Sequence, residues 1–225
     1  MKTKFKILFF FIIVSLVSGC RKSTDCYSCD VKIDSFIKEN EKELKSIGVR
    51  KMSSYDRPLQ RAIFRMYDKS KKQQMWEEKF QFILDNNPNN YSKEELSFVR
   101  EILGYISQDG IEKIKNDQIN SWITKSRRDY SWNDGRIRFL LMSLDVDEEV
   151  YLKSVSTSLA ALTVTCNCST TSDGVLVSDC SSAAPECSDK NLNCETTENS
   201  GCGPLWMHRC DGDCQVEGTE RTNKN

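Results

Sequence analysis

The distribution of cysteine constrains this chain more than any other feature. Three of its 11 cysteines lie near the start, eight lie near the end, and residues 30–165 contain none. The terminal group is Cys166, Cys168, Cys180, Cys187, Cys194, Cys202, Cys210 and Cys214. A segment so rich in cysteine and so poor in large apolar residues cannot offset the entropy of an ordered chain with a hydrophobic core alone. The pattern predicts a small disulfide-rich, loop-dominated C-terminal module over residues 166–214.

The N-terminus indicates the compartment in which such disulfides would form. Lys2, Lys4 and Lys6 precede the apolar run Ile7–Val14, and small residues then lead to Cys20. This layout is typical of a secretory signal, and the run is shorter than the roughly 20 residues that a membrane-spanning helix needs. The sequence VSGC that ends at Cys20 resembles a bacterial lipobox, which implies cleavage after residue 19 and lipidation of the Cys20 sulfur. The alternative is an ordinary secretion signal in which Cys20 is incidental.

The cysteine-free part of the chain is predicted to be helical. Apolar residues recur at steps of three and four, which gathers them on one face of a helix. Such patterns cover residues 33–47, 57–67, 70–83, 92–106, 111–123 and 137–144. We therefore expect a mostly α protein in which five or six short helices pack as an irregular bundle.

Local signals place some of the helix ends. Pro58 suits a first helical turn. Ser92 and Glu95 have the spacing of a capping box, in which each side chain satisfies a backbone donor of the other residue. The composition of residues 86–92 indicates a turn, and Asp109-Gly110 is predicted to end a helix.

These patterns divide the chain into six expected parts. They are a lipoprotein signal peptide at 1–19, an anchor segment at 20–30, a helical domain at 31–152, a linker at 153–165, the disulfide-rich module at 166–214 and a disordered tail at 215–225. The anchor segment holds Cys26 and Cys29. With Cys20 lipidated, the ten other cysteines are expected to form disulfides with partners that the sequence does not specify.

Zinc is the alternative to disulfides in the C-terminal module, because His208 and Cys210 are close together. Structural zinc sites favour two pairs of closely spaced ligands, and the cysteine spacing here does not form two such pairs. Thiols in an oxidising compartment are expected to pair with each other, with 105 connectivities open to eight cysteines. His208 is then expected to be a polar surface residue beside Trp206. Gly201 and Gly203 predict a tight bend with positive φ around Cys202.

Two stretches of the module carry a resemblance to a known family. The stretch CNCSTTSD at Cys166–Asp173 and the stretch GCGPLWMHRC at Gly201–Cys210 are similar to parts of the fulvocin C-related bacteriocins. The whole chain resembles larger fulvocin C-related proteins of Gram-negative bacteria, which carry such a tail behind an export signal and a helical region. The resemblance implies a role in interbacterial antagonism and supplies no catalytic or binding residue. Release of the tail as a free peptide would need proteolysis within residues 153–165.

Other classes of function have weaker support in the sequence. Cys26 and Cys29 have the spacing of a thiol–disulfide exchange motif, but Asp30 follows them and no βαβ pattern does. Glu77-Glu78 and the acidic run at residues 145–149 could be carboxylate pairs for acid–base catalysis, although solvated helix faces have the same composition. Neither part of the chain has the basic stripe of a nucleic-acid-binding protein. We expect no enzymatic activity, no cofactor and no metal.

The sequence therefore predicts a lipid-anchored protein of the cell envelope, facing the periplasm or the cell surface. Its partners would be the membrane, through the lipid, and a component of a target cell's envelope; its oligomeric state stays open. The expected function is interbacterial antagonism by a disulfide-stapled, bacteriocin-like module. The alternatives are a non-catalytic binding or structural lipoprotein and, third, a periplasmic thiol-redox protein.

Overall fold

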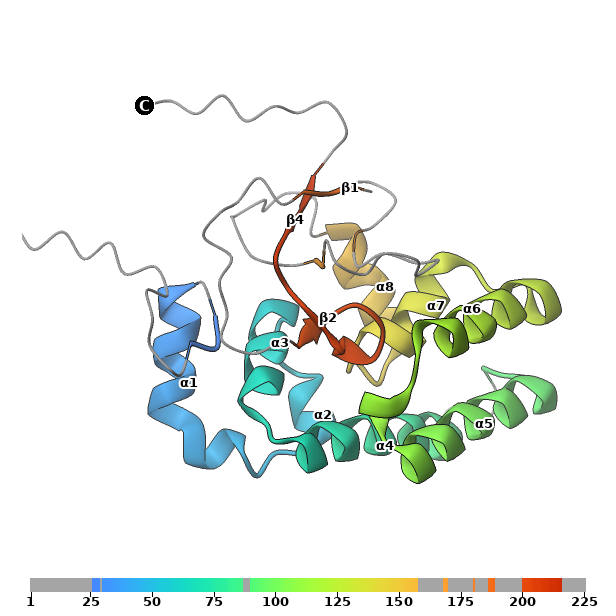
Figure 1. The fold of residues 1–225 in the computed structure, drawn as a ribbon, viewed down its shortest axis with the longest axis horizontal. Coiled ribbons are helices and arrows are strands. Elements are labelled where there is room, and N and C mark those ends of the chain that lie inside the picture. The colour runs from blue at the N-terminus through green and yellow to red at the C-terminus, as the bar shows by residue number, and fades with distance from the viewer. Residues whose placement is uncertain are drawn as a thin grey trace, which may run out of the picture.

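The computed structural model describes residues 26–28, 30–86, 90–157, 168–169, 180, 186–188 and 200–215. Within them the protein is mostly helical, as predicted, with eight α-helices followed by a small C-terminal segment that contains a disulfide and a two-stranded hairpin (Figure 1). The helices are α1 (Val31–Leu44), α2 (Val49–Met52), α3 (Arg57–Met66), α4 (Lys69–Asn86), α5 (Lys93–Asp109), α6 (Asn116–Tyr130), α7 (Asp134–Met142) and α8 (Glu148–Thr157).

The predicted helix ends at Pro58 and Ser92 are confirmed. Asp56 caps α3 by accepting a hydrogen bond from the backbone N–H of Leu59, and Pro58 lies in the first turn. Ser92 and Glu95 form the capping box of α5, with the Ser92 hydroxyl 3.1 Å from the Glu95 nitrogen. α5 ends at Gly110, whose φ of 80° lies in the left-handed region that favours glycine.

The described residues form eight α-helices where five or six were expected, and α1, α6 and α8 are among the places where the structure differs from the expected ranges. α1 ends at Leu44, because Gly48 is extended and α2 begins after it. The stretch from Ile111 to Ile123 splits into the 3₁₀-helix η1 (Ile111–Lys113) and α6, since Ile114 is extended between them. α8 runs to Thr157, into the range expected to be a linker, and the Asp147 carboxylate caps it by accepting from the Val150 N–H.

The strands are short and lie at the C-terminal end. β2 (Gly201–Cys202) pairs antiparallel with β3 (His208–Arg209), and the 3₁₀-helix η3 (Pro204–Trp206) connects them. β1 (Glu186–Ser188) pairs antiparallel with β4 (Asp213–Gln215), with Cys187 opposite Cys214 in the register. Figure 1 shows the β2–β3 hairpin lying over the helices, beside α3 and α7, which it contacts through β2 and η3.

One cluster of buried apolar side chains joins the helices and the hairpin. It is centred on the large aromatic residues of α3 to α7 and also includes Leu205 and Trp206. α4 and α5 pack side by side, and α3 is buried along most of its length because it lies between α1 and the hairpin (Figure 1). The hairpin is therefore part of the helical core and not an appendage on its surface.

Candidate functional site

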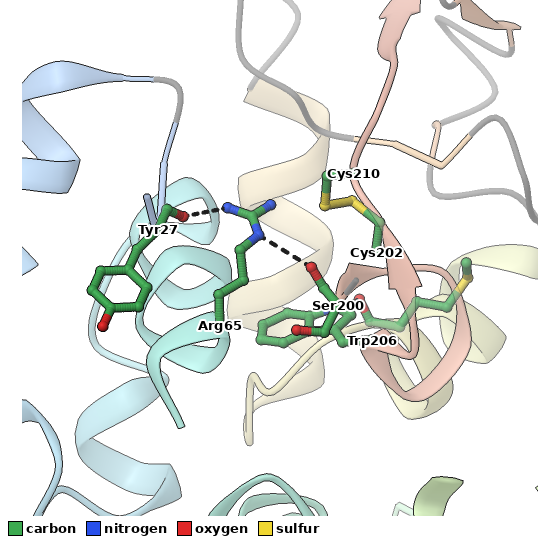
Figure 2. Close-up of a disulfide and its surroundings, with 7 residues drawn as sticks. Tyr27, Arg65, Ser200, Cys202, Trp206 and Cys210 are labelled. Carbon is green, nitrogen blue, oxygen red and sulfur yellow. Dashed lines mark hydrogen bonds between the residues drawn. A yellow bond between two sulfur atoms is a disulfide. The ribbon is translucent and has the colours of Figure 1, made fainter. Parts of the chain in front are cut away.

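The candidate site is the docked C-terminal hairpin, which we define as residues 200–210. A disulfide joins Cys202 to Cys210, with 5.1 Å between their Cα atoms, and closes the hairpin into a loop (Figure 2). Both cysteines are fully buried. The bridge is therefore shielded from solvent inside the protein.

The backbone of the hairpin contains the tight bend that the sequence predicted. Gly201 has a φ of 107° and Gly203 a φ of 69°. A Cβ atom on Gly203 would lie only 2.4 Å from Cδ2 of His208, so this position excludes any side chain. Leu205 and Trp206 also have positive φ, of 53° and 52°, which costs a non-glycine residue roughly 1–2 kcal/mol. The hairpin needs other contacts to hold this conformation.

Trp206 provides the main contact between the hairpin and the helices. Its side chain is fully buried, and its ring meets Phe64 of α3 and Trp76 of α4 edge to face, with centroids 5.2 and 6.1 Å away. Its indole Nε1 donates a 3.0 Å hydrogen bond to the carbonyl oxygen of Met142, the last residue of α7. Such aromatic pairs contribute about 0.5–1.5 kcal/mol beyond the area that they bury.

The C-terminal end of α7 receives a second donor from elsewhere in the fold. The last carbonyls of a helix have no partner within it and must find one outside. Lys79 of α4 is fully buried and donates from Nζ to the carbonyls of Phe139, Leu140 (3.0 Å) and Ser143. Lys79 and Trp206 together satisfy the carbonyls of Phe139, Leu140 and Met142 at this helix end, where the macrodipole favours a cation.

Burial and nearby charges act on Lys79 in opposite directions. Burial lowers the pKa of Lys79 to about 7, although the carboxylates of Asp145 and Glu148 partly oppose this effect. Three carbonyl acceptors match the three protons of an ammonium group, and the rings of Phe139 and Trp76 face Nζ at 4.6 and 5.2 Å from their centroids. Lys79 therefore acts as a cap of α7, within the core.

Arg65 of α3 links the hairpin to the N-terminal segment. Its Nε donates to the carbonyl of Ser200 at 3.1 Å, and one terminal nitrogen donates to the carbonyl of Tyr27 at 2.8 Å (Figure 2). Its guanidinium also lies against Gly201, with Nε 3.0 Å from the position that a Cβ would take. One buried arginine thus holds two segments that are far apart in the sequence and that both contain cysteine.

The predicted disulfide cysteines fall into three groups. Cys202 and Cys210 pair with each other, and Cys26, Cys168 and Cys180 are also disulfide-bonded. Cys187 and Cys214 lie opposite each other on β1 and β4. Cys29, Cys166 and Cys194, and Cys20 with its expected lipid, lie outside the described residues.

His208, which was expected to be a surface residue, is less exposed than a fully solvated side chain. The ring is half-buried and packs across Gly203, because the closed hairpin folds β3 back over the bend. Acidic residues that were considered as possible carboxylate pairs have structural partners. Glu78 accepts from the N–H of Val49 at the start of α2, while buried Asp145 accepts from Gln60 and Ser143.

Glu148, in the acidic run, accepts from Arg136 at 3.0 Å. Arg136 in turn lies over the rings of Tyr91 and Trp132. Glu95 joins this group, because its carboxylate accepts a hydrogen bond from the indole of Trp132. Glu148 and Glu95 therefore help to hold helices α5, α7 and α8 together.

Sequence reasoning missed Lys79 and Arg65 as organising residues. Both belong to amphipathic helices in which a basic residue is usually solvated, and no local pattern separates them from their exposed neighbours. A signal for Trp206 does exist. Leu205, Trp206 and Met207 are consecutive large apolar residues in an otherwise polar tail, and such a run indicates a segment that docks on another surface.

Among the helices that the structure describes, none is long and apolar enough to cross a membrane. In the same part of the chain, no three His, Cys, Asp or Glu side chains gather in a way that could hold a metal ion. Comparison of the chain with protein-family models, with curated proteins and with solved structures finds no match.

Proposed function

We propose that this chain is an exported, lipid-anchored, non-catalytic protein of the cell envelope that acts in interbacterial antagonism. In this proposal its cysteine-rich C-terminal part and its helical part work as one folded unit. The observation that carries the proposal is the burial of Trp206 in the helical core beside the closed Cys202–Cys210 bridge. The antagonistic role itself comes from the resemblance of residues 166–173 and 201–210 to fulvocin C-related bacteriocins.

The disulfides support an extracytoplasmic location. Disulfides persist outside the cytoplasm and are rare inside it, where thiols are kept reduced. Cys26, Cys168 and Cys180 are disulfide-bonded in addition to the bridge of the hairpin. This agrees with the export signal that the first 20 residues predict.

The docked hairpin favours action by the whole chain over release of a tail peptide. A cut within residues 153–165 would leave the hairpin attached, because Trp206 and Leu205 would still be buried and Arg65 would still bind Ser200. Removing the hairpin would expose these apolar side chains to water, at a cost of about 25 cal/mol for each Å². The target-contacting surface is then expected to include both parts.

A growth-inhibition assay tests this proposal. The purified oxidised protein, residues 21–225, is compared with the oxidised peptide 164–216 on a panel of related strains. We expect inhibition by the whole chain and at least tenfold weaker inhibition by the peptide. If the peptide were as potent as the whole chain, the two parts would not need to act as one folded unit. If no strain of the panel were inhibited, the antagonistic role would be contradicted.

A second candidate is a binding or structural lipoprotein that acts at the membrane of its own cell. The observation that favours it is the short tether: Cys26 is buried against the body, and it follows Cys20 by six residue steps, with five residues between them. At no more than about 3.6 Å per residue, the tether would reach about 22 Å at most. Crosslinking in producing cells tests it, since a specific partner should be lost when Cys20→Ala removes the anchor.

The periplasmic thiol-redox alternative has less support. A reactive cysteine needs an accessible thiolate. Cys26 is 1 % exposed and disulfide-bonded, and its sulfur lies 3.4 Å from the carbonyl of Ser28. An oxidase or reductase activity that Cys26→Ser abolishes would restore this alternative.

A further inference from the structure

We infer that closure of the Cys202–Cys210 bridge controls completion of the helical core, so that the chain reaches the described fold only after oxidation. The inference does not depend on the proposed antagonism. It rests on three features of the hairpin: weak backbone pairing, two residues in the left-handed region, and a tryptophan that fills the centre of another part of the protein.

The hairpin has few interactions of its own with which to keep its shape. β2 and β3 share only two residue pairs, Gly201 with Arg209 and Cys202 with His208. An isolated two-stranded hairpin is at best marginally stable in water. Leu205 and Trp206 oppose the conformation further, because both have positive φ. A covalent closure at the ends of the loop supplies the constraint that the backbone pairing lacks.

The position of Trp206 couples this loop to the helices. The indole fills a socket formed by Phe64 of α3, Trp76 of α4 and the end of α7 at Met142. Without the indole the Met142 carbonyl loses its partner, and the aromatic rings lose the side chain between them. An open hairpin that cannot present Trp206 therefore leaves the helical core incomplete.

Burial of the sulfurs sets the order of events. Cys202 and Cys210 are fully buried in the folded protein, so an oxidant cannot reach them after docking. The thiolate of one cysteine first attacks a disulfide donor, such as glutathione disulfide, and releases one thiol. The second cysteine then attacks the mixed disulfide and releases a second thiol. Two electrons pass to the donor, whose two thiols take up two protons, and the closed loop then inserts Trp206.

Because oxidation comes before docking, the redox state of the compartment determines whether the chain completes its fold. In a reducing compartment the bridge does not form, Trp206 does not enter the socket, and the helical core stays incomplete. In an oxidising compartment the loop closes, Trp206 docks, and the bridge becomes shielded from reductants. We call the hairpin a latch, because the helical core is complete only when the Cys202–Cys210 bridge is closed.

A double-mutant cycle on the full chain tests the latch. The variants are Cys202→Ser with Cys210→Ser, Trp206→Ala, and all three changes together. Amide hydrogen exchange is measured by mass spectrometry for peptides of α3, α4 and α7, which form the socket, and for peptides of α6, which serve as the internal control. We expect exchange at the socket to rise at least tenfold in both the serine pair and Trp206→Ala.

The latch also predicts that the triple variant exchanges within twofold of Trp206→Ala, because the bridge acts through the tryptophan. Two results would overturn the inference. One is a serine pair whose socket exchanges within twofold of the native protein. The other is a triple variant in which the two effects multiply.

Stepwise reduction of the native protein provides the same test if the serine pair does not fold. Dithiothreitol is added in steps, and alkylation with mass spectrometry identifies the reduced cysteines in each molecule. Socket protection should disappear only in molecules in which Cys202 and Cys210 are reduced. Molecules that keep the socket protected with this pair reduced, or lose protection with the pair intact, would contradict the latch.

Discussion

The indole nitrogen of Trp206 donates a hydrogen bond to the carbonyl of Met142, which lies 64 residues earlier in the sequence. This hydrogen bond joins the cysteine-rich end of the chain to the C-terminus of α7. The same helix end is also capped by Lys79 of α4. The end of α7 is therefore one of the places at which the two chemically different parts of the protein meet, together with α3 and α4.

Trp206→Ala should destabilise the protein by about 3–5 kcal/mol, because it leaves a large cavity between Phe64 and Trp76 and an unpaired carbonyl. Trp206→Phe keeps an aromatic ring and should cost less. Val150→Ala, at a side chain that is 57 % exposed, is the control and should stay within about 0.5 kcal/mol. Urea unfolding measures all three, and a loss under 1 kcal/mol for Trp206→Ala would contradict the docking.

Gly203→Ala and Gly104→Ala should have effects of opposite sign. At Gly203 a methyl group would clash with His208 at 2.4 Å, and its φ of 69° is unfavourable for alanine. At Gly104, inside α5, a methyl group meets nothing within 4 Å, so alanine should stabilise the helix by about 0.5–1 kcal/mol. Thermal unfolding should show a lower midpoint for the first variant and a higher one for the second. If the two variants were equally stable, the close packing and positive φ of Gly203 would be contradicted.

Arg65→Met should loosen two segments at once. It removes the donors to the carbonyls of Tyr27 and Ser200, and each buried carbonyl left without a partner costs about 1–3 kcal/mol. Arg65→Lys should recover only part of the loss, because an ammonium lacks the planar fork of the guanidinium.

Arg100→Met, at an exposed position of α5, is the matched control for Arg65. Hydrogen exchange should increase around Tyr27 and in the hairpin for Arg65→Met and in neither segment for the control. An increase confined to one of the two segments would show that Arg65 does not link them.

The buried Lys79 predicts that stability rises with pH. Its pKa is about 7 in the folded protein, against an ordinary value of 10.5. Between these values the unfolded chain binds more protons than the folded protein, so the free energy of unfolding increases with pH. Above about pH 10 the raised pKa values of Tyr67 and Tyr91 reverse the trend, because the folded protein then keeps protons that the unfolded chain loses.

Lys79→Met removes this pH dependence, and Lys69→Met, at an exposed lysine of the same helix, should keep it. Urea unfolding between pH 7 and 9.5 measures the slope. A native slope near zero would mean that the three carbonyl acceptors hold Lys79 fully charged throughout this range.

Glu95 predicts a loss of stability in acid. Partial burial acts to raise the pKa of Glu95, but hydrogen bonds from Ser92 and Trp132 and the charge of Arg136 outweigh it and hold the pKa below 4.5. The carboxylate therefore stabilises the fold above pH 4.5, and this contribution disappears as the pH falls through the lowered pKa. Glu95→Gln should lose this contribution at neutral pH, whereas the exposed neighbour Glu94→Gln should not. Equal stability curves for both variants between pH 3 and 7 would be inconsistent with this role.

Local features were predictable from the sequence. The helical class follows from apolar periodicity, the start of α5 follows from the spacing of Ser92 and Glu95, and the bend follows from Gly201 and Gly203. Each of these depends on residues within about four positions of each other. Helix ends that depend on distant contacts were harder to place, as at α2, which Glu78 caps from 29 residues away.

The sequence by itself determined that the chain forms helices, that cysteine gathers in a polar tail, and that glycine allows a tight bend within that tail. Only the tertiary structure decided that Trp206 lies in the helical core, that Lys79 caps α7, and that Arg65 holds Tyr27 and Ser200 together. The physical reason is the distance along the sequence over which each kind of interaction acts. Periodicity and capping act along neighbouring turns of the backbone, whereas a buried indole, ammonium or guanidinium finds its carbonyl partners up to 135 residues away, wherever packing brings them.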